Sequence, residues 1–173
     1  MTTLVMSVEG VLSDHPPSDT VLNYEATAAG RLLYNLMKPT SRIILLSSDP
    51  YEDRVKSWLV RERFTGYAAV YTHPLGDVRT AKVWKSEKVR DLIGLGHHIG
   101  FYLDTDPATI EAVLDLGVDA LLVAKPGSLP GDKADTEYAP WYSLVNKVEE
   151  QNMARAMKMM EEENAQHSEA TGE

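Results

Sequence analysis

Carboxylate and hydroxyl side chains stand at or just after the ends of three apolar runs that have the composition of buried strands. They are Ser7 and Glu9 for the first run, Ser47 and Ser48 for the second, and Asp104 and Asp106 for a later one. Two of these groups also stand where Asp-Pro pairs open helices, and free N–H groups at a helix N-terminus favour an anion such as phosphate. The pattern therefore favours a phosphate-binding site, with simple capping of the helices as the alternative.

Five short apolar runs alternate with amphipathic stretches along the chain. The runs cover residues 3–8, 42–46, 67–71, 99–103 and 120–124, and the stretches cover 24–37, 50–63, 83–93 and 107–116. Continuous apolar runs suit strands of a parallel sheet, and strand–helix alternation implies right-handed crossovers. We therefore expect an α/β fold, a Rossmann-like doubly wound parallel sheet of five strands with helices on both faces. Ligands of such sheets bind outside the carboxyl ends of the strands, where the polar side chains stand.

Composition excludes several classes of protein. The 173 residues are one domain's worth, and they are 43% hydrophobic and 25% charged. The absence of cysteine excludes disulfides, thiol nucleophiles and thiolate zinc sites. No stretch approaches the ~18 apolar residues of a membrane span, and the N-terminus lacks the basic start of a signal peptide. We expect a soluble, cytoplasmic protein that does not associate with membranes.

The formal net charge of −9 is concentrated near the C-terminus. Residues 149–173 contain seven acids against Arg155 and Lys158, so more than half of the excess negative charge lies there. A general nucleic-acid surface needs clustered Lys and Arg. We therefore do not expect one.

The C-terminal residues differ in pattern from the rest. We expect an α/β domain over residues 1–140, an amphipathic Met-rich helix over 141–165 and a disordered acidic tail over 166–173. Three methionines at i, i+4 and i+7 share one helix face, namely Met153, Met157 and Met160. Flexible thioethers pack adaptably, so this face suits a protein partner, and packing on the protein's own body fits equally well.

The strand ends also match, in order and spacing, the four motifs of a known family. Residues 7–12 (Ser-Val-Glu-Gly-Val-Leu) match the first motif, a strand ending in Asp-x-Asp-Gly-Thr/Val-Leu, and residues 44–47 match the second, a strand ending in Ser or Thr. The third motif is a Lys before the fourth strand, matched by Lys85 or alternatively by Lys88. The fourth is a strand ending in acids, matched by residues 102–106. Over about residues 3–125 the chain resembles the haloacid dehalogenase (HAD) superfamily of phosphatases and phosphotransferases.

The resemblance implies a fold and a set of roles. The expected strand order is 5-4-1-2-3, with a minimal cap and an extra C-terminal helix. In the family, the first Asp of the first motif becomes an aspartyl-phosphate and the second acts as acid and base. Mg²⁺ binds the first Asp, a main-chain carbonyl at the second and the acid of the fourth motif. By this correspondence the nucleophile position is Ser7, the acid/base position is Glu9, the phosphate-binding positions are Ser47, Ser48 and Lys85, and the metal positions are Asp104 and, more weakly, Asp106.

The first motif departs from the family pattern at both acidic positions. A serine hydroxyl is a poor nucleophile without an adjacent base, and Ser7 also removes an anionic ligand that Mg²⁺ prefers. Glu9 keeps an acid but adds a methylene, and misplacing a catalytic group by about 1 Å can cost roughly 100-fold in rate. These two changes argue against aspartyl-phosphate chemistry.

Each of these residues also has a structural interpretation. Ser7 can satisfy a strand end, Glu9 can be a solvated turn residue, Asp106 can cap the helix that begins at Pro107, and Lys85 can lie on a solvated helix face.

Three hypotheses for the function follow. The first is a degenerate HAD-like protein without phosphoryl transfer, acting as a binding or interaction module with residual phosphate or Mg²⁺ binding. The second is a divalent-metal-dependent phosphatase that uses Glu9 and Asp104 on an exposed phosphomonoester, such as a nucleotide, a nucleic-acid end or a phosphoprotein. The third is an assembly protein that works through its C-terminal helix.

Overall fold

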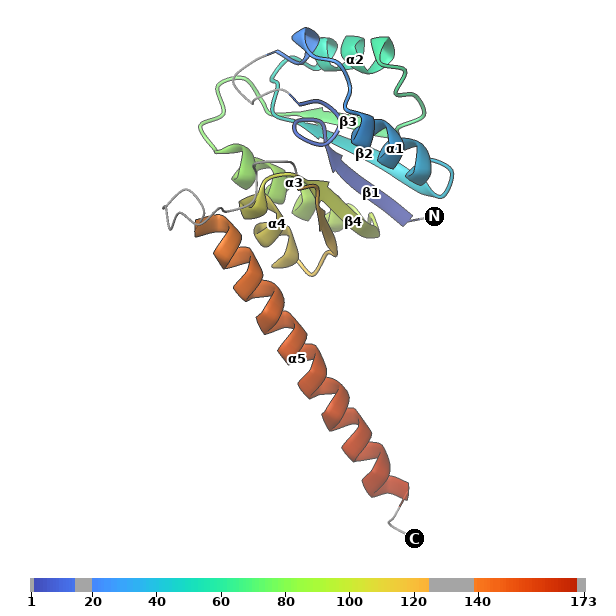
Figure 1. Ribbon diagram of the computed structural model, residues 1–173, viewed down its shortest axis with the longest axis vertical. Coiled ribbons are helices and arrows are strands. Elements are labelled where there is room, and N and C mark those ends of the chain that lie inside the picture. The colour runs from blue at the N-terminus through green and yellow to red at the C-terminus, as the bar shows by residue number, and fades with distance from the viewer. Residues whose placement is uncertain (1, 15–19, 125–138, 171–173) are drawn as a thin grey trace.

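The computed structural model describes residues 2–14, 20–124 and 139–170. Strands and helices alternate through the described residues (Figure 1). The elements are β1 (Thr2–Ser7), the short 3-10 helix η1 (Val21–Asn23), α1 (Ala28–Met37), β2 (Ser41–Ser47), α2 (Glu52–Arg61), β3 (Ala69–Thr72), α3 (Ala81–Gly94), β4 (Ile99–Asp104), α4 (Pro107–Leu114), β5 (Ala120–Leu122) and α5 (Ala139–Ala170).

The five strands form one parallel sheet in the order β3-β2-β1-β4-β5. This is the expected order read from the opposite edge of the sheet, so the predicted doubly wound, Rossmann-like fold is confirmed. Between β1 and α1 the described residues form only η1 and turns, as a minimal cap requires.

The strands alternate their side chains between two apolar clusters, one on each face of the sheet. Leu4 and Met6 of β1 pack with residues of α1 and α2, whereas Val5 packs with residues of α3 and α4. A strand buried on both faces does not alternate polar and apolar residues. These strands therefore appear in the sequence as continuous apolar runs.

Two helices begin later than the sequence predicts, and the hydrogen bonds of the residues before them show where each helix starts. The α1 helix begins at Ala28 rather than Tyr24, since Thr27 is its N-cap and accepts a hydrogen bond from the Gly30 N–H. The α2 helix begins at Glu52, and the Asp49 carboxylate accepts a hydrogen bond from the Tyr51 N–H in the turn before it. The α4 helix begins at Pro107 after an Asp106 cap, as expected.

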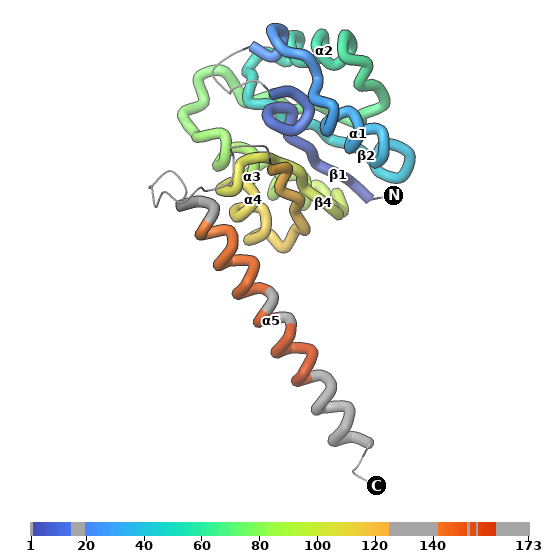
Figure 2. The backbone as a smooth tube through the Cα atoms, viewed as in Figure 1, coloured from blue at the N-terminus to red at the C-terminus, as the bar shows by residue number. Residues whose placement is uncertain are grey.

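The α5 helix is longer than predicted and points away from the rest of the protein (Figures 1 and 2). It extends through residues 166–170, which we expected to belong to a disordered tail, because Ala, Gln and Glu in this stretch favour helix. Residues 171–173 of that expected tail lie outside the described residues, as do residues 125–138 before α5.

The first turns of α5 dock on the domain. Leu144 is buried in the cluster beneath α4, the Ser143 hydroxyl donates a 2.6 Å hydrogen bond to Glu111, and Lys147 forms an ion pair with Asp115. Within the described part of the chain, no helix has the combination of length and apolar character that a membrane span needs.

Candidate functional site

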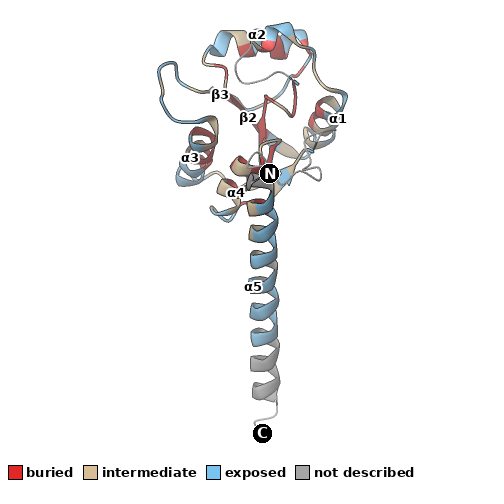
Figure 3. Ribbon diagram, turned by 60° about the vertical axis from the view of Figure 1, so that its left-hand side comes forward, coloured by how far each residue is buried: buried red, intermediate tan, exposed pale blue. Residues whose placement is uncertain are grey.

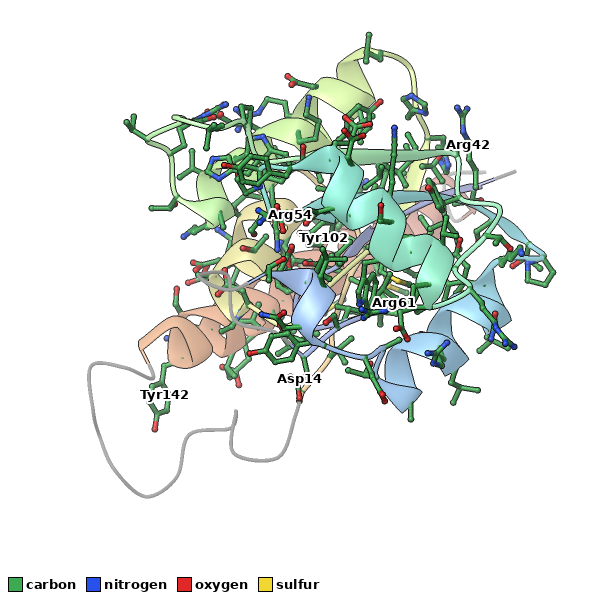
Figure 4. All side chains as sticks on the ribbon, turned by 90° about the horizontal axis from the view of Figure 1, so that it is seen from above. Asp14, Arg42, Arg54, Arg61, Tyr102 and Tyr142 are labelled. Atoms are coloured by element: carbon green, nitrogen blue, oxygen red, sulfur yellow. The ribbon has the colours of Figure 1, made fainter. Side chains whose placement is uncertain are left out.

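The strand order brings the predicted site residues together. Because β2, β1 and β4 are neighbours in a parallel sheet, Ser47, Ser7 and Asp104 stand side by side at their carboxyl ends. Figure 4 views the domain from above and labels Tyr102 of β4 and Arg54 of α2, which lie at this end. All three polar side chains at the strand ends are buried, with no more than 1% of their surface exposed.

Lys85 of α3 joins this cluster from the neighbouring helix. Its Nζ donates hydrogen bonds to Ser7 Oγ (2.7 Å) and to Asp104 Oδ2 (3.1 Å), and it lies 3.8 Å from Glu9 Oε2. Lys88, the alternative in the sequence, instead pairs with Asp91 at the surface of the same helix. Burial alone would lower the pKa of the Lys85 ammonium, but attraction by Asp104 and Glu9 outweighs burial and raises it, so the ammonium stays charged.

The Ser7 hydroxyl is held in a fixed arrangement. It donates a 3.0 Å hydrogen bond to the main-chain carbonyl of Glu9 and accepts one from Lys85. A peptide carbonyl is not a base that can remove the proton, and the charged ammonium has no lone pair to do so. The geometry therefore does not activate Ser7 as a nucleophile.

The Glu9 side chain turns toward β2. Its Oε1 accepts a 2.5 Å hydrogen bond from Ser47 Oγ and a 2.8 Å hydrogen bond from the Ser48 N–H, while Ser47 Oγ accepts one from the Asp49 N–H. These are donors that we expected to hold a phosphate. In this structure they hold a carboxylate of the protein itself.

The Asp104 carboxylate receives hydrogen bonds on both oxygens. Oδ2 accepts from Tyr102 (2.7 Å) and Lys85, and Oδ1 accepts from the backbone N–H groups of Thr105 (2.7 Å) and Asp106 (3.1 Å). Sequence reasoning missed Tyr102, because an aromatic residue in an apolar strand is most simply interpreted as core. Burial, followed by the charge of Asp104 and the hydrogen bond to it, raises the pKa of the Tyr102 phenol, so it remains a donor.

Asp106 stands apart from this network of side chains. Its carboxylate caps α4 by accepting hydrogen bonds from the N–H groups of Ala108 and Thr109 and from the Thr109 hydroxyl. The structure therefore places Asp106 in its capping role and does not bring its carboxylate to Ser7.

The loops after β1 and β4 approach each other closely at Gly10. Its φ of +79° is rare for a residue with a side chain, and a Cβ atom there would lie 2.0 Å from Thr105 Oγ1. Glycine is therefore required both by its backbone conformation and by its contact with the next loop.

A hollow lies over the N-terminus of α2. It has a volume of about 660 Å³ and is lined by residues 50–54, among which the Arg54 guanidinium lies 4.0 Å from the centre of the Tyr51 ring. Ser7, Glu9, Lys85 and Asp104 are not among the described residues that line it. The hollow and the buried network are therefore separate features.

The expected Mg²⁺ site can be tested against these donors. The three expected ligands are the side chain at position 7, the Glu9 carbonyl and Asp104. The first two bind each other, and both oxygens of the third are engaged by protein donors, one of them an ammonium at 3.1 Å. Across the described ranges, no three His, Asp or Glu side chains gather as a metal ion requires. In this arrangement the residues present do not fit Mg²⁺.

Comparison with known proteins identifies the fold and nothing finer. The sequence matches no protein-family model and no curated protein. Among solved structures, a chain of the Pnkp1/Rnl/Hen1 RNA repair complex is similar, with a TM-score of 0.63 and 18% identity over 70% of this chain, and a second structure of the Pnkp1/Rnl/Hen1 complex agrees equally well. This chain spans 42% and 45% of the lengths of those two chains. At this identity the likeness establishes a shared fold.

Proposed function

We propose that this protein is a degenerate member of the HAD-like phosphatase fold that does not carry out phosphoryl transfer and acts as a binding and interaction module. The proposal rests on the four motifs in their expected order on a sheet of the expected topology. The likeness to chains of an RNA repair complex is consistent with this fold.

One observation carries the proposal: the polar groups at the strand ends bond to one another. The Lys85 ammonium lies among Ser7, Asp104 and Glu9, where it supplies positive charge from within the chain. The Glu9 carboxylate occupies the Ser47 and Ser48 donors, where it supplies negative charge from within the chain. A phosphate and its metal would have to displace both, at the cost of leaving buried charges unpaired.

The proposal is tested by phosphatase assays on p-nitrophenyl phosphate and on a 3′-phosphorylated oligonucleotide, with Mg²⁺, Mn²⁺ and Co²⁺ in turn. We expect the wild-type chain to remain at background with every metal. Turnover by the wild type that Asp104→Asn abolishes, without loss of the folded circular dichroism spectrum, would overturn the proposal. The double variant Ser7→Asp, Glu9→Asp serves as the positive comparison, since it restores both acidic positions of the first motif.

A second candidate function is recognition of a phosphorylated ligand over α2. Two buried atoms favour it, because Ser48 Oγ and Arg54 Nε have no hydrogen-bond partner among the described residues. The acids Glu52 and Asp53 in the first turn of α2 oppose an anion there. Fluorescence polarisation with a labelled 3′-phosphorylated oligonucleotide measures this function. Weaker binding by Arg54→Met, with Arg42→Met on the exposed start of β2 as the matched control, is the result expected if the site binds phosphate.

A further inference from the structure

The loop between β3 and α3 is exposed except at two of its side chains (Figure 3). Among residues 73–80, His73 and Asp77 are the only two that are not largely exposed, with 16% and 11% of their side-chain surface accessible. Leu75 and Val78, at the tip of the loop, are 72% and 98% exposed. A loop that buries so little apolar surface depends on its polar contacts to hold its position. The two side chains that turn inward are both ionisable.

Asp77 is the centre of the polar contacts within this loop. Its Oδ1 accepts hydrogen bonds from the Arg79 N–H (3.0 Å) and from Arg79 Nε (2.9 Å), and its own N–H donates to the Pro74 carbonyl (3.1 Å). Its Oδ2 pairs with the Arg79 guanidinium, which also pairs with Glu87 of α3. The hydrogen bonds from Arg79 hold the pKa of the Asp77 carboxyl well below its usual value, so the carboxylate stays charged near neutral pH.

His73 stands between this carboxylate and α3. Its backbone N–H donates a 2.9 Å hydrogen bond to the Ser47 carbonyl, which continues the pairing of β3 with β2. Its ring centre lies 5.3 Å from the ring centre of Trp84, a residue that is 2% exposed, and its Nε2 lies 3.6 Å from Asp77 Oδ2. That separation is too long for a hydrogen bond, and the buried Nε2 has no hydrogen-bond partner among the described residues. The contact between the imidazole and the carboxylate is therefore incomplete.

A proton on the imidazole completes this contact. Histidine is the side chain that ordinarily changes its charge between about pH 5 and 8. When both ring nitrogens carry a proton, Nε2 is a charged donor, and such donors approach a carboxylate oxygen to about 2.7–2.9 Å. Closing the present 3.6 Å gap to that distance requires a movement of about 1 Å.

The other charged groups around His73 partly cancel one another. Arg79 of the loop opposes a charged imidazole, and Glu87, which contacts Arg79 from α3, offsets that opposition. Lys88 of α3 is engaged in a surface ion pair on its own helix. The end of β2 beside the ring carries uncharged serines. The carboxylate of Asp77 is therefore the charge that acts most directly on the imidazole.

We propose that His73 and Asp77 form a pH-dependent clasp for the β3–α3 loop. At acidic pH the imidazolium bonds to Asp77 and fastens the loop to the end of β3. As the pH rises the neutral ring releases the carboxylate to Arg79 alone, and the loop with its apolar tip moves more freely. This inference does not depend on the proposed function, because neither residue of the clasp belongs to the buried network around Lys85.

The first test is the tryptophan fluorescence of the full chain between pH 5 and 8, the range in which histidine titrates. A protonated imidazole in contact with an indole quenches its emission, so acidification should lower the emission of Trp84 in one sigmoidal step. The step should be lost in His73→Gln and in Trp84→Phe, and it should remain in His98→Gln, the control at an exposed histidine. A wild type without the step, or a step that His73→Gln leaves intact, would overturn the proposal.

The role of the carboxylate is tested by Asp77→Asn in the same titration. The midpoint of the step should fall by about 0.5–1 pH unit, because a neighbouring opposite charge favours the charged imidazole. Glu87→Gln is the matched control, since it removes the same charge from Arg79 and leaves the contact between His73 and Asp77 in place. An unchanged midpoint in Asp77→Asn, or equal changes in the two variants, contradicts the clasp.

Amide hydrogen exchange on the wild type remains decisive if a variant fails to fold. The Arg79 N–H donates to Asp77 and therefore reports on the loop. A change of 0.5–1 pH unit in the midpoint corresponds to about 3–10-fold in an equilibrium, so this amide should exchange about 3–10-fold more slowly at pH 5.5 than at pH 7.5 after correction for the intrinsic rate. The amides of α1 serve as the internal reference. Equal corrected rates for Arg79 at the two pH values show that no clasp forms.

Discussion

The strand ends around Ser7 and the sheet face at Phe101 and Leu121 differ in how completely their side chains are packed or bonded within the described part of the chain. At the strand ends, Lys85 contacts three oxygen-bearing side chains and Asp104 accepts hydrogen bonds on both carboxylate oxygens. On that face, Phe101 and Leu121 remain over 40% exposed, whereas their strand neighbours Leu4 and Leu103 are buried.

The residues that carry the sequence motifs are therefore not the residues whose apolar surface is left exposed. In the region that carries the motifs, the polar side chains bond to one another across β1, β2, α3 and β4, which contributes to holding the domain together. The sheet face at Phe101 and Leu121 carries no motif and leaves part of its apolar surface exposed. The strand ends are therefore the better guide to the stability of the domain.

The largest expected effect comes from removing the central cation of the network. Lys85→Met leaves Asp104 and Glu9 buried without their counter-charge, and breaking a buried ion pair in this way costs about 3–5 kcal/mol. Urea unfolding followed by circular dichroism measures the change in the free energy of unfolding.

Lys88→Met is the matched control for this variant, because Lys88 lies on the same helix and pairs with Asp91 at the surface. A surface ion pair contributes about 0–1 kcal/mol. If the two variants lose equal free energy of unfolding, the buried ion pairs of Lys85 contribute no more to stability than the surface ion pair of Lys88.

A smaller effect is expected from Tyr102→Phe. The substitution keeps the packing of the ring and removes one donor from Asp104 Oδ2, which should lower the free energy of unfolding by about 1–3 kcal/mol. Tyr71→Phe, on a ring partly packed against the same apolar cluster, is the comparison in the same denaturation experiment. No change in Tyr102→Phe would show that Asp104 does not need this hydrogen bond.

The smallest expected effect is a dependence on pH of the stability that Lys85 contributes. The folded protein raises the pKa of Lys85 above its ordinary value of 10.5, so the stability that the ammonium contributes is fully present below pH 10.5. It is lost as the pH rises through the higher pKa of the folded state. The difference in unfolding free energy between the wild type and Lys85→Met should therefore narrow in strongly alkaline solution. A difference that stays constant or widens there would contradict the charged state of Lys85.

Much of the fold is predictable because its signals are local. Five continuous apolar runs separated by helical stretches determine a parallel sheet, and Asp106 before Pro107 marks the start of α4 correctly. The starts of α1 and α2 are less predictable, since they depend on whether Thr27 and Asp49 bond to the nearest helix or to the turn before it.

The site is predictable in its location and less so in its contacts. Parallel topology alone brings Ser7, Ser47 and Asp104 to one edge of the sheet. The sequence does not reveal that Glu9 turns toward Ser47, or that Tyr102 completes the shell around Asp104, because both depend on side-chain directions set by tertiary packing. The sequence does not reveal the exposure of Phe101 and Leu121 either, since both have the same apolar character as their buried neighbours.

The contact at Gly10 has a consequence for how a molecule would reach the interior. Because Gly10 has no side chain, the turn after β1 packs directly against Thr105 in the turn after β4. The two turns therefore leave no space between them at this point. Even a methyl group at position 10 would push the two turns apart. A ligand that approached Asp104 from this side would therefore have to separate the two turns first.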